Sequence, residues 1–371
     1  MNRRRFLIGA AGAAAFVPSF SATLARAALT PARPRGYAAC AADADGNFFA
    51  AGFSADGAPG FRIDLPERGH DIAFHPARAE AVVFSRRPGV TMHVVDIAAG
   101  GRAREIEARP DRHFYGHGVF TPDGRHMFVT ENDFEAGRGV LGIYDTKGYR
   151  RIDEIPSHGV GPHQLRRMPD GRTLVIGNGG IRTHPDLGRA KLNVEDMKPS
   201  LAFVDSQTGR RLHAVRLPEP LHKLSIRHLD VNGAGTVAFG MQYEGDRRDR
   251  VPMIALVTGG AAPRLLKAPG GVDHMMRHYT GSTVFDSSGR YVAVSSPRGH
   301  VVGVWETRSA DFVGNVKARD ACGLAATGKT GEFLVTSGDG SIRLCDAPGL
   351  RTRELRAADR SVHWDNHIGV A

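Results

Sequence analysis

The stretch GHGVFTPDGRHMFVTENDFEAGRGVLGIYDT, residues 116–146, contains the pattern that decides the fold. Short apolar runs at 119–120, 127–130 and 140–144 are separated by a Pro-Asp-Gly turn and by a predicted loop at 131–139. Apolar and polar residues alternate with a period of two between such turns, which predicts antiparallel β-strands joined by tight connections. One unit of this size cannot bury both of its faces, so its repetition along the chain matters.

The same pattern recurs, and the chain contains seven units. They span residues 37–65, 69–96, 116–155, 162–205, 227–257, 282–306 and 323–355. Each unit of roughly 40 to 60 residues offers about four strands, which predicts an all-β fold, a seven-bladed β-propeller of the WD40 or YVTN-like kind. The tail at 363–370 is similar to the start of a further blade. It either supplies the innermost strand of the first unit or lies across the mouth of the channel.

The first residues have a different composition. Three arginines at 3–5, followed by Phe6 and Leu7, precede a small and apolar run, and Ala25-Arg26-Ala27 offers a cleavage site. This pattern predicts a twin-arginine (Tat) signal peptide at 1–27, a linker at 28–36 and the propeller at 37–371. An ordinary secretory signal is the alternative. Either signal predicts a periplasmic protein with no membrane span once the signal is removed.

Charge and cysteine content narrow the range of partners. The formal net charge is +10, and four of the arginines belong to the predicted signal peptide. The other Lys and Arg residues are spread along the chain and form no cluster that is interleaved with aromatic residues, so the sequence does not indicate a nucleic-acid surface. Cys40, Cys322 and Cys345 lie in apolar runs at irregular spacing, which predicts buried thiols rather than a disulfide framework.

Histidines open the inner strands of several units. In a propeller, the starts of the inner strands and the loops after the second strands lie on one face, so these imidazoles converge at one channel mouth. Imidazole suits iron, copper, zinc and nickel. The predicted metal ligands are His70, His117, His163, His228, Glu131, His184, His278 and His367, with Asp71, Asp133, Met275 and Met276 as further candidates. Each histidine alone also fits a hydrogen bond to a carbonyl or carboxylate, and only the recurrence favours a metal.

Cationic and polar residues of the same loops predict a cofactor-binding surface. Arginine binds carboxylate and phosphate through two parallel hydrogen bonds, although solvated surface charges need no such role. The predicted residues are Arg87, Asn132, Asn178, Arg189, Arg227, Tyr243 and Arg298. No catalytic residue is predicted. The chain has no H-E-x-x-H or C-x-x-C motif, and no G-x-S-x-G turn frames Ser225 or Ser282.

Longer motifs add a resemblance to a known family. They include RGHD at 68–71, GHGVF at 116–120, GPHQL at 161–165, NGGIRTHPDLGRAKLN at 178–193 and WDNH at 364–367. With these motifs the chain resembles an exported bacterial family catalogued as domain of unknown function 1513, over its whole length after the signal. The resemblance implies a propeller-like protein encoded beside imelysin-type iron-regulated proteins and haem-peroxidase-like proteins. That neighbourhood implies iron or copper handling in the periplasm but names no reaction.

Three hypotheses for the function follow. The first is a periplasmic propeller that binds an iron or copper ion at a histidine-rich channel mouth and takes part in metal uptake or delivery, with imelysin-type proteins as partners. The second is a metal-dependent oxidoreductase or a lactonase-like hydrolase at the same mouth, with Glu131 or Asp133 as acid or base. The third is a scaffold that binds other proteins and has no chemistry. The sequence favours a protein without catalysis and leaves the enzyme open.

Overall fold

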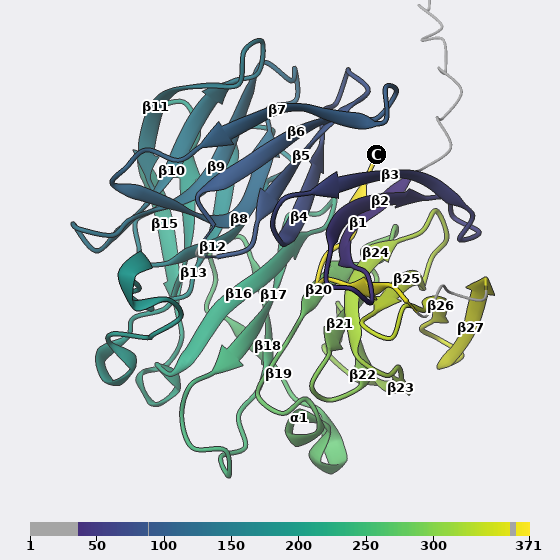
Figure 1. Cartoon of the computed structure of the whole chain (residues 1–371). Helices are drawn as coiled ribbons and strands as arrows, with labels where there is room; N and C mark the ends of the chain where they lie inside the picture. Colours follow the sequence, from purple (N-terminus) through teal and green to yellow (C-terminus); the bar gives the residue numbers. More distant parts are fainter. Residues whose placement is uncertain (1–35, 88, 357–360) are drawn as a thin grey trace, which may run out of the picture. The chain divides into compact units, whose positions relative to one another are not determined.

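Seven antiparallel β-sheets follow one another around a ring in the computed structural model, which describes residues 36–87, 89–356 and 361–371 (Figure 1). The prediction of an all-β, seven-bladed propeller is confirmed. The predicted signal peptide at 1–27, and all but the last residue of the predicted linker at 28–36, lie outside the described residues. None of the helices in the described ranges is long and apolar enough to span a membrane.

The strands are numbered along the chain and grouped into blades. Blade 1 contains β1 (Tyr37–Ala42), β2 (Phe48–Phe53) and β3 (Pro59–Leu65). Blade 2 contains β4 (Gly69–Phe74), β5 (Glu80–Ser85), β6 (Thr91–Asp96) and β7 (Gly101–Glu107). Blade 3 contains β8 (Arg112–Phe120), β9 (His126–Asp133), β10 (Arg138–Asp145) and β11 (Arg150–Pro156). Blade 4 contains β12 (Pro162–Arg167), β13 (Thr173–Asn178), β14 (Ser200–Asp205) and β15 (Arg211–Arg216).

The remaining blades continue the same order. Blade 5 contains β16 (Leu224–Val231), β17 (Thr236–Tyr243), β18 (Ile254–Thr258) and β19 (Arg264–Leu266). Blade 6 contains β20 (Ser282–Phe285), β21 (Tyr291–Ser296), β22 (Val301–Glu306) and β23 (Phe312–Lys317). Blade 7 contains β24 (Ala321–Ala326), β25 (Glu332–Ser337), β26 (Ile342–Asp346) and β27 (Arg351–Arg356). The described helical segments are short: η1 (Pro185–Leu187), η2 (Val194–Asp196), η3 (Glu219–Leu221), η4 (Pro269–Gly271) and α1 (Val272–Met275).

The C-terminal tail closes the ring. β28 (His363–Trp364) and β29 (Gly369–Val370) both pair antiparallel with β1, so they form the innermost strand of blade 1. The first strands of blades 2 to 7 contact each other in succession, and β29 contacts β4 of blade 2. The tail therefore supplies the inner strand that blade 1 lacks, and the alternative that it lies across the channel mouth is wrong.

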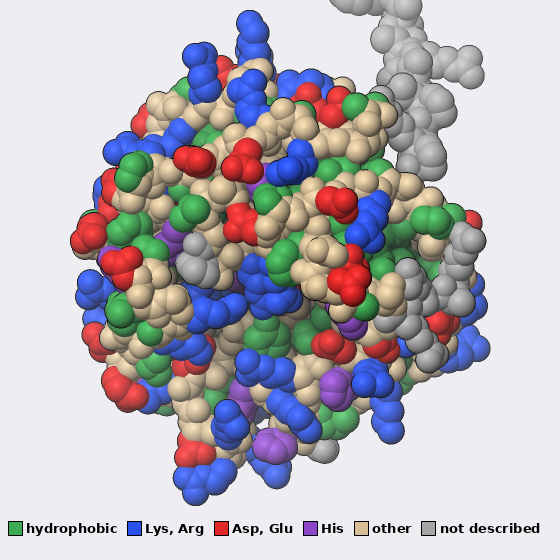
Figure 2. All heavy atoms as spheres, in the orientation of Figure 1, with side chains coloured by type: hydrophobic (Ala, Val, Ile, Leu, Met, Phe, Trp, Pro, Cys, Tyr) green, Lys and Arg blue, Asp and Glu red, His purple; other side chains and the backbone are tan. Residues whose placement is uncertain are grey.

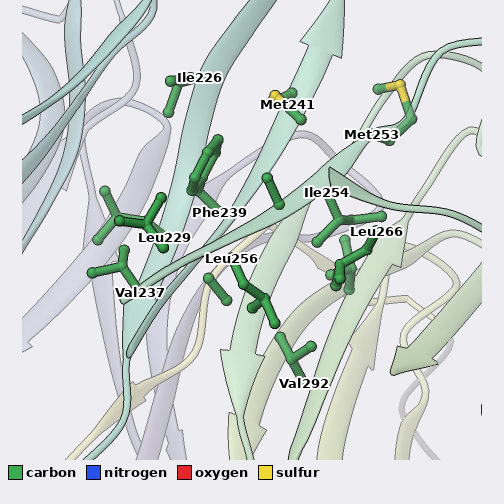
Figure 3. Packing of buried hydrophobic residues seen from close by; sticks show 14 of the residues in the cluster. Ile226, Leu229, Val237, Phe239, Met241, Met253, Ile254, Leu256, Leu266 and Val292 are labelled. Carbon is green, nitrogen blue, oxygen red and sulfur yellow. The ribbon is translucent and has the colours of Figure 1, made fainter. Parts of the chain in front are cut away.

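The core lies between blades rather than within them. In β5, Val82 and Phe84 pack toward blade 3, while Ala81 and Val83 pack toward blade 1. Because both faces of such a strand are covered, it reads as a continuous apolar run instead of a clean alternation. Figure 3 shows the same arrangement where Val292 of blade 6 lies near the apolar side chains of blade 5. A shared cluster of buried residues joins each pair of neighbouring blades.

Most of the inner strands carry a shift of pairing register that is typical of a β-bulge. The pairing register shifts between Gly69 and Asp71 in β4, and between Phe114 and Gly118 in β8. Corresponding shifts occur in β12, β16 and β24, whereas β20 pairs with β21 in continuous register. In blade 1, residues 365–368 form the break between β28 and β29. A bulge frees residues from the ladder and changes the direction of their side chains, so these shifts decide what points toward the centre.

One predicted loop is shorter than expected. The interval predicted at 131–139 is a turn of four residues, 134–137, because β9 extends to Asp133 and β10 begins at Arg138. Polar residues at 131–133 suggested a loop, but they continue the ladder and their side chains have partners inside the protein. Asn132 donates from Nδ2 to the carbonyl of Thr183 at 3.1 Å.

Candidate metal centre

Four histidines from four consecutive blades meet at the centre of the ring. His70 in β4, His117 in β8, His163 in β12 and His228 in β16 each offer one ring nitrogen, and these nitrogens all lie within 4.8 Å of one another. Their ring centroids are 4.8 to 6.4 Å apart. The bulges explain this convergence, because His70, His117 and His163 lie inside the shifted segments and His228 directly follows one.

A fifth imidazole comes from the C-terminal strand. The ring centroid of His367 lies 4.7 Å from those of His70 and His117 and 4.6 Å from that of His228. Its side chain projects from residues 365–368, where pairing with β1 is interrupted. We call His70, His117, His163, His228 and His367 the histidine cluster. His163 is half-buried, and the other four rings are almost fully buried.

Two carboxylates orient rings of the cluster. Nδ1 of His117 donates to Oδ2 of Asp71 at 2.7 Å, and Nδ1 of His70 lies 3.4 Å from Oδ1 of Asp365. A carboxylate only accepts, so Nδ1 of His117 carries the proton and Nε2 keeps its lone pair. Hydrogen bonding of this kind fixes the tautomer and orientation of metal-binding histidines and raises their basicity.

Several nitrogens of the cluster have no hydrogen-bonding partner within the described part of the protein. These buried atoms are Nε2 of His117, Nδ1 of His163, Nδ1 of His228 and Nε2 of His367. Nε2 of His163 and Nε2 of His228 are 3.1 Å apart, so without an ion the two rings share one proton. Burying polar atoms without partners is unfavourable, and a metal ion gives the lone pairs among these nitrogens a partner.

Burial keeps four imidazoles of the cluster neutral, those of His117, His163, His228 and His367. Burial lowers the pKa of His117 to about 4, although Asp71 opposes that effect. Burial, followed by neighbouring cluster histidines, lowers the pKa values of His163, His228 and His367 well below the usual range. A neutral imidazole is the form that binds a metal, because the ligand must lose its proton first. The cluster is therefore ready for a cation at neutral pH.

The distances fit one ion after a small adjustment. Metal–nitrogen bonds are about 2.0–2.1 Å long, so two ligands of one ion lie at most about 4.2 Å apart. Two nitrogens at the outer limit of 4.8 Å must therefore approach each other by at least about 0.6 Å to share one ion. Such a change needs only small side-chain rotations. The donor set is nitrogen alone, which suits copper, zinc, nickel and iron.

Three predicted ligands lie elsewhere. Glu131 accepts from Arg151 at 2.9 Å and from Tyr144 at 2.8 Å, so its carboxylate is already neutralised inside blade 3. His184 lies 3.5 Å from Glu135 and packs on Phe134. His278 pairs through Nε2 with the carbonyl of Asp249 at 2.9 Å. The structure does not bring Glu131, His184 or His278 to the cluster, because blade 3 and the longer loops hold them in other contacts.

The further candidates divide in the same way. Asp71 contacts the cluster through His117. Asp133 pairs with Arg112 and Arg138. The side chain of Met275 is exposed, and that of Met276 is part of the apolar core beside blades 5 and 6. The three cysteines are free and buried, as predicted.

A cavity of about 260 Å³ opens directly onto the cluster. Its wall includes His70, His163 and His228 together with four of the predicted cofactor-binding residues, Arg87, Arg189, Arg227 and Arg298. The other three do not line it. Asn132 donates a hydrogen bond to the carbonyl of Thr183, and Asn178 donates one to the carbonyl of Ser157. The hydroxyl of Tyr243 donates to the carboxylate of Asp249. These three side chains hold loops and strands in place.

A second cavity, of about 390 Å³, lies against another member of the cluster, His367. Its wall includes Asp71, His367, Arg166 and Asp230, and the last two form an ion pair at 3.7 Å. His70, His163 and His228 line the first cavity and His367 lines the second, so members of the histidine cluster border both spaces.

Sequence reasoning missed several residues of the site. Asp365 binds Arg86 at 3.0 Å and Arg68 at 2.6 Å as well as facing His70. Its place in the WDNH motif, two residues before His367, is a signal that would have identified it. Tyr115 and Tyr279 line the first cavity but come from segments without any motif. Only the folded chain brings them there.

The fold and the site together define a β-propeller whose buried central histidines could hold a metal ion. Residues 63–371 match the family described as Protein of unknown function (DUF1513), so the chain belongs to this family. No curated protein matches the chain significantly. Among solved structures, it is similar to Kuenenia stuttgartiensis Hydrazine Synthase at 15% identity, with a TM-score of 0.60 over 86% of this chain and 95% of that chain. At this identity the likeness concerns the fold alone.

Proposed function

We propose that the protein binds a transition metal ion, iron or copper, in the histidine cluster and takes part in metal uptake or delivery in the bacterial periplasm. The observation that carries the proposal is the meeting of four ring nitrogens within 4.8 Å, from four blades, in a buried position. Lowered pKa values keep three of these rings, those of His117, His163 and His228, available as ligands at neutral pH. A purely structural role for the rings would leave four buried nitrogens without partners.

Binding without catalysis fits the surroundings of the cluster better than the enzymes considered from the sequence. The acid or base expected for those reactions was Glu131 or Asp133. Both carboxylates are engaged with arginines of blade 3, Glu131 with Arg151 and Asp133 with Arg138. Neither of these residues lines either of the two cavities that border the histidine cluster. This supports a carrier or delivery protein.

The cellular setting of the proposal comes from sequence. The arginines at 3–5 and the small-residue site at 25–27 support export by the twin-arginine route. The resemblance to a family encoded beside imelysin-type proteins supports such proteins as partners in iron handling. Fractionation of cells producing the full chain tests the first point, and co-purification with an imelysin-type protein of the same organism tests the second.

Metal analysis of the protein purified without an affinity tag tests the central claim. We expect the metal-stripped protein to take up about one equivalent of iron or copper at micromolar concentration, as imidazole-rich sites do. The double variant His117→Ala/His163→Ala should lose this binding, while the control His126→Ala, which changes another histidine of blade 3, should keep it. Equal uptake by wild type and double variant, or no uptake by the wild type, would contradict the proposal.

A further inference from the structure

The cavity of about 260 Å³ above the histidines has a strongly cationic wall. Six cationic side chains line it and no carboxylate does: Arg86, Arg87, Arg189, Lys191, Arg227 and Arg298. They come from the loops after β5 and β21, from the segment between β13 and β14, and from β16. In Figure 2, Lys and Arg side chains gather across the middle and lower part of the face in view.

Carboxylates neutralise only half of these cations. Arg86 is bound by Asp365 at 3.0 Å, while Lys191 and Arg227 share Glu244, the latter at 3.9 Å. Within the described ranges, no carboxylate lies within 4.0 Å of the guanidinium groups of Arg87, Arg189 or Arg298. Arg298 instead lies over the ring of Tyr279, 4.4 Å from its centroid. Three guanidinium groups at one cavity therefore remain without an anionic partner.

Holding these charges together is unfavourable in the protein alone. Burial, followed by the charge of Arg227, lowers the pKa of Arg87. Arg227 is buried, and its Nε has no hydrogen-bonding partner in the described part of the chain. Like charges repel more strongly where water is partly excluded. Such an arrangement is typical of a site whose charges are balanced by a bound anion.

We propose that this cavity binds a small polycarboxylate, a compound with two or three carboxylate groups. Arginine pairs with carboxylate through two parallel hydrogen bonds, and three unpaired guanidinium groups offer separate places for such pairs. The volume of 260 Å³ lies below the roughly 300–1,000 Å³ of pockets for drug-sized ligands, so the ligand is small. Tyr115, Gln242 and Asn366 add polar groups for a hydroxyl of the ligand.

The inner end of the cavity connects this site to the cluster. His70, His163 and His228 line the cavity, so a carboxylate oxygen of the ligand can reach a metal ion held there. The anion site itself does not depend on the metal, since none of its cationic side chains is a candidate metal ligand. The inference therefore extends the proposed function, in that the metal is taken or released together with a carboxylate chelator.

Calorimetric titration of the metal-stripped, tag-free protein tests the anion site. We expect citrate to bind at least tenfold more tightly than acetate or inorganic phosphate, with affinity that falls as salt rises. The double variant Arg189→Gln/Arg298→Gln removes two exposed cavity arginines and should weaken citrate binding at least tenfold. The matched control Arg125→Gln/Arg290→Gln removes two arginines whose side chains are 80% and 62% exposed elsewhere, and should bind citrate as the wild type does.

The outcomes separate the two proposals. No citrate binding, or equal binding by the cavity variant and its control, would overturn the anion site even if metal uptake persists. Phosphate binding as tight as citrate binding would overturn the polycarboxylate class. Citrate binding by the double variant His117→Ala/His367→Ala, which removes two cluster histidines that do not line this cavity, would support an anion site independent of the metal. Because Arg189 and Arg298 are exposed, circular dichroism should show both variants folded.

Discussion

Asp71 accepts the Nδ1 proton of His117 through Oδ2 at 2.7 Å, and its Oδ1 accepts the backbone N–H of Ile72 at 2.8 Å. The carboxylate is thus held from the backbone side while it orients the ring. The Asp71→Asn variant should still fold but bind metal about 10–100-fold more weakly, the range for loss of such an orienting group. Metal titration measures this effect. The exposed turn variant Asp123→Asn is the control, and equal affinity in both variants would mean that Asp71 does not position His117.

The burial of His117 also has a consequence for stability in acid. Its pKa is about 4 in the folded protein and about 6.5 when unfolded, so the unfolded chain binds more protons between these values. In the metal-free protein, His117 does not reduce the free energy of unfolding above pH 6.5. As the pH falls toward 4, His117 alone lowers this free energy by up to about 3 kcal/mol. The lowered pKa values of His163 and His228 act in the same direction.

Urea unfolding of the metal-free protein at pH 7, 5.5 and 4.5 measures this loss. The variant His117→Asn should show a shallower dependence on pH, because it lacks one of the groups that gain a proton on unfolding. The control His126→Ala should keep the wild-type slope. A wild-type stability that stays constant from pH 7 to 4.5 would show that the cluster does not take up protons on unfolding.

At the scale of elements, the sequence predicted the strands but not the bulges. Turn dipeptides and apolar runs located the inner strands and placed His70, His117, His163 and His228 near their starts. The register shift that turns three of these rings out of the ladder has no sequence signature of its own. Polarity was also misleading for Glu131, because an apolar–polar pattern cannot distinguish an exposed carboxylate from one buried against an arginine.

Gly116 shows how tightly a bulge of β8 is fitted to the cluster. Its φ is +94°, and a Cβ there would lie 2.7 Å from Cδ2 of His70. The variant Gly116→Ala should lose about 1–2 kcal/mol of stability from backbone strain, and it should also displace the ring of His70 and weaken metal binding. Chemical denaturation and metal titration measure the two effects.

The control for this variant separates strain from the clash. Gly46 has a similar φ of +86°, and a Cβ at that position would meet no atom within 4 Å. The variant Gly46→Ala should therefore be destabilised by a comparable amount while it binds metal normally. If both alanine variants kept the wild-type affinity, His70 would not be a ligand whose position depends on the bulge.

At the scale of the whole molecule, the seven-unit repeat predicted the ring, but it could not predict what the ring gathers. The spacing of the units shows that blades are neighbours, and each pair of neighbours shares an apolar cluster. Residues far apart in the chain meet only after closure. Asp365 reaches Arg68, Arg86 and His70 of the segment around blade 2 across almost the full length of the sequence.

Closure itself depends on the C-terminal strand, and Trp364 is its main apolar contact. The indole packs on Phe53 of blade 1 with centroids 5.6 Å apart, and its Nε1 donates to the carbonyl of Gly340 in blade 7 at 3.2 Å. Trp364 therefore joins the first and last blades. The variant Trp364→Ala should lose about 3–5 kcal/mol of stability, as for other large buried aromatic residues. The control Val370→Ala changes an exposed side chain of β29 and should be nearly neutral.

Metal addition to these two variants tests whether closure and the histidine cluster are linked. A ligand at 100 times its dissociation constant stabilises the folded protein by about 2.7 kcal/mol. His70, His117, His163 and His228 belong to blades 2 to 5 and remain in place when the tail loosens. Metal at a fixed multiple of each protein's own dissociation constant should therefore give this increment in both variants. A link between ring closure and the histidine cluster would change the metal affinity. If His367 is a fifth ligand, Trp364→Ala should raise the dissociation constant for the metal, because His367 lies at the site less often when the tail is loosened. Thermal unfolding with metal titration gives both quantities, and wild-type stability for Trp364→Ala would show that the ring closes without this contact.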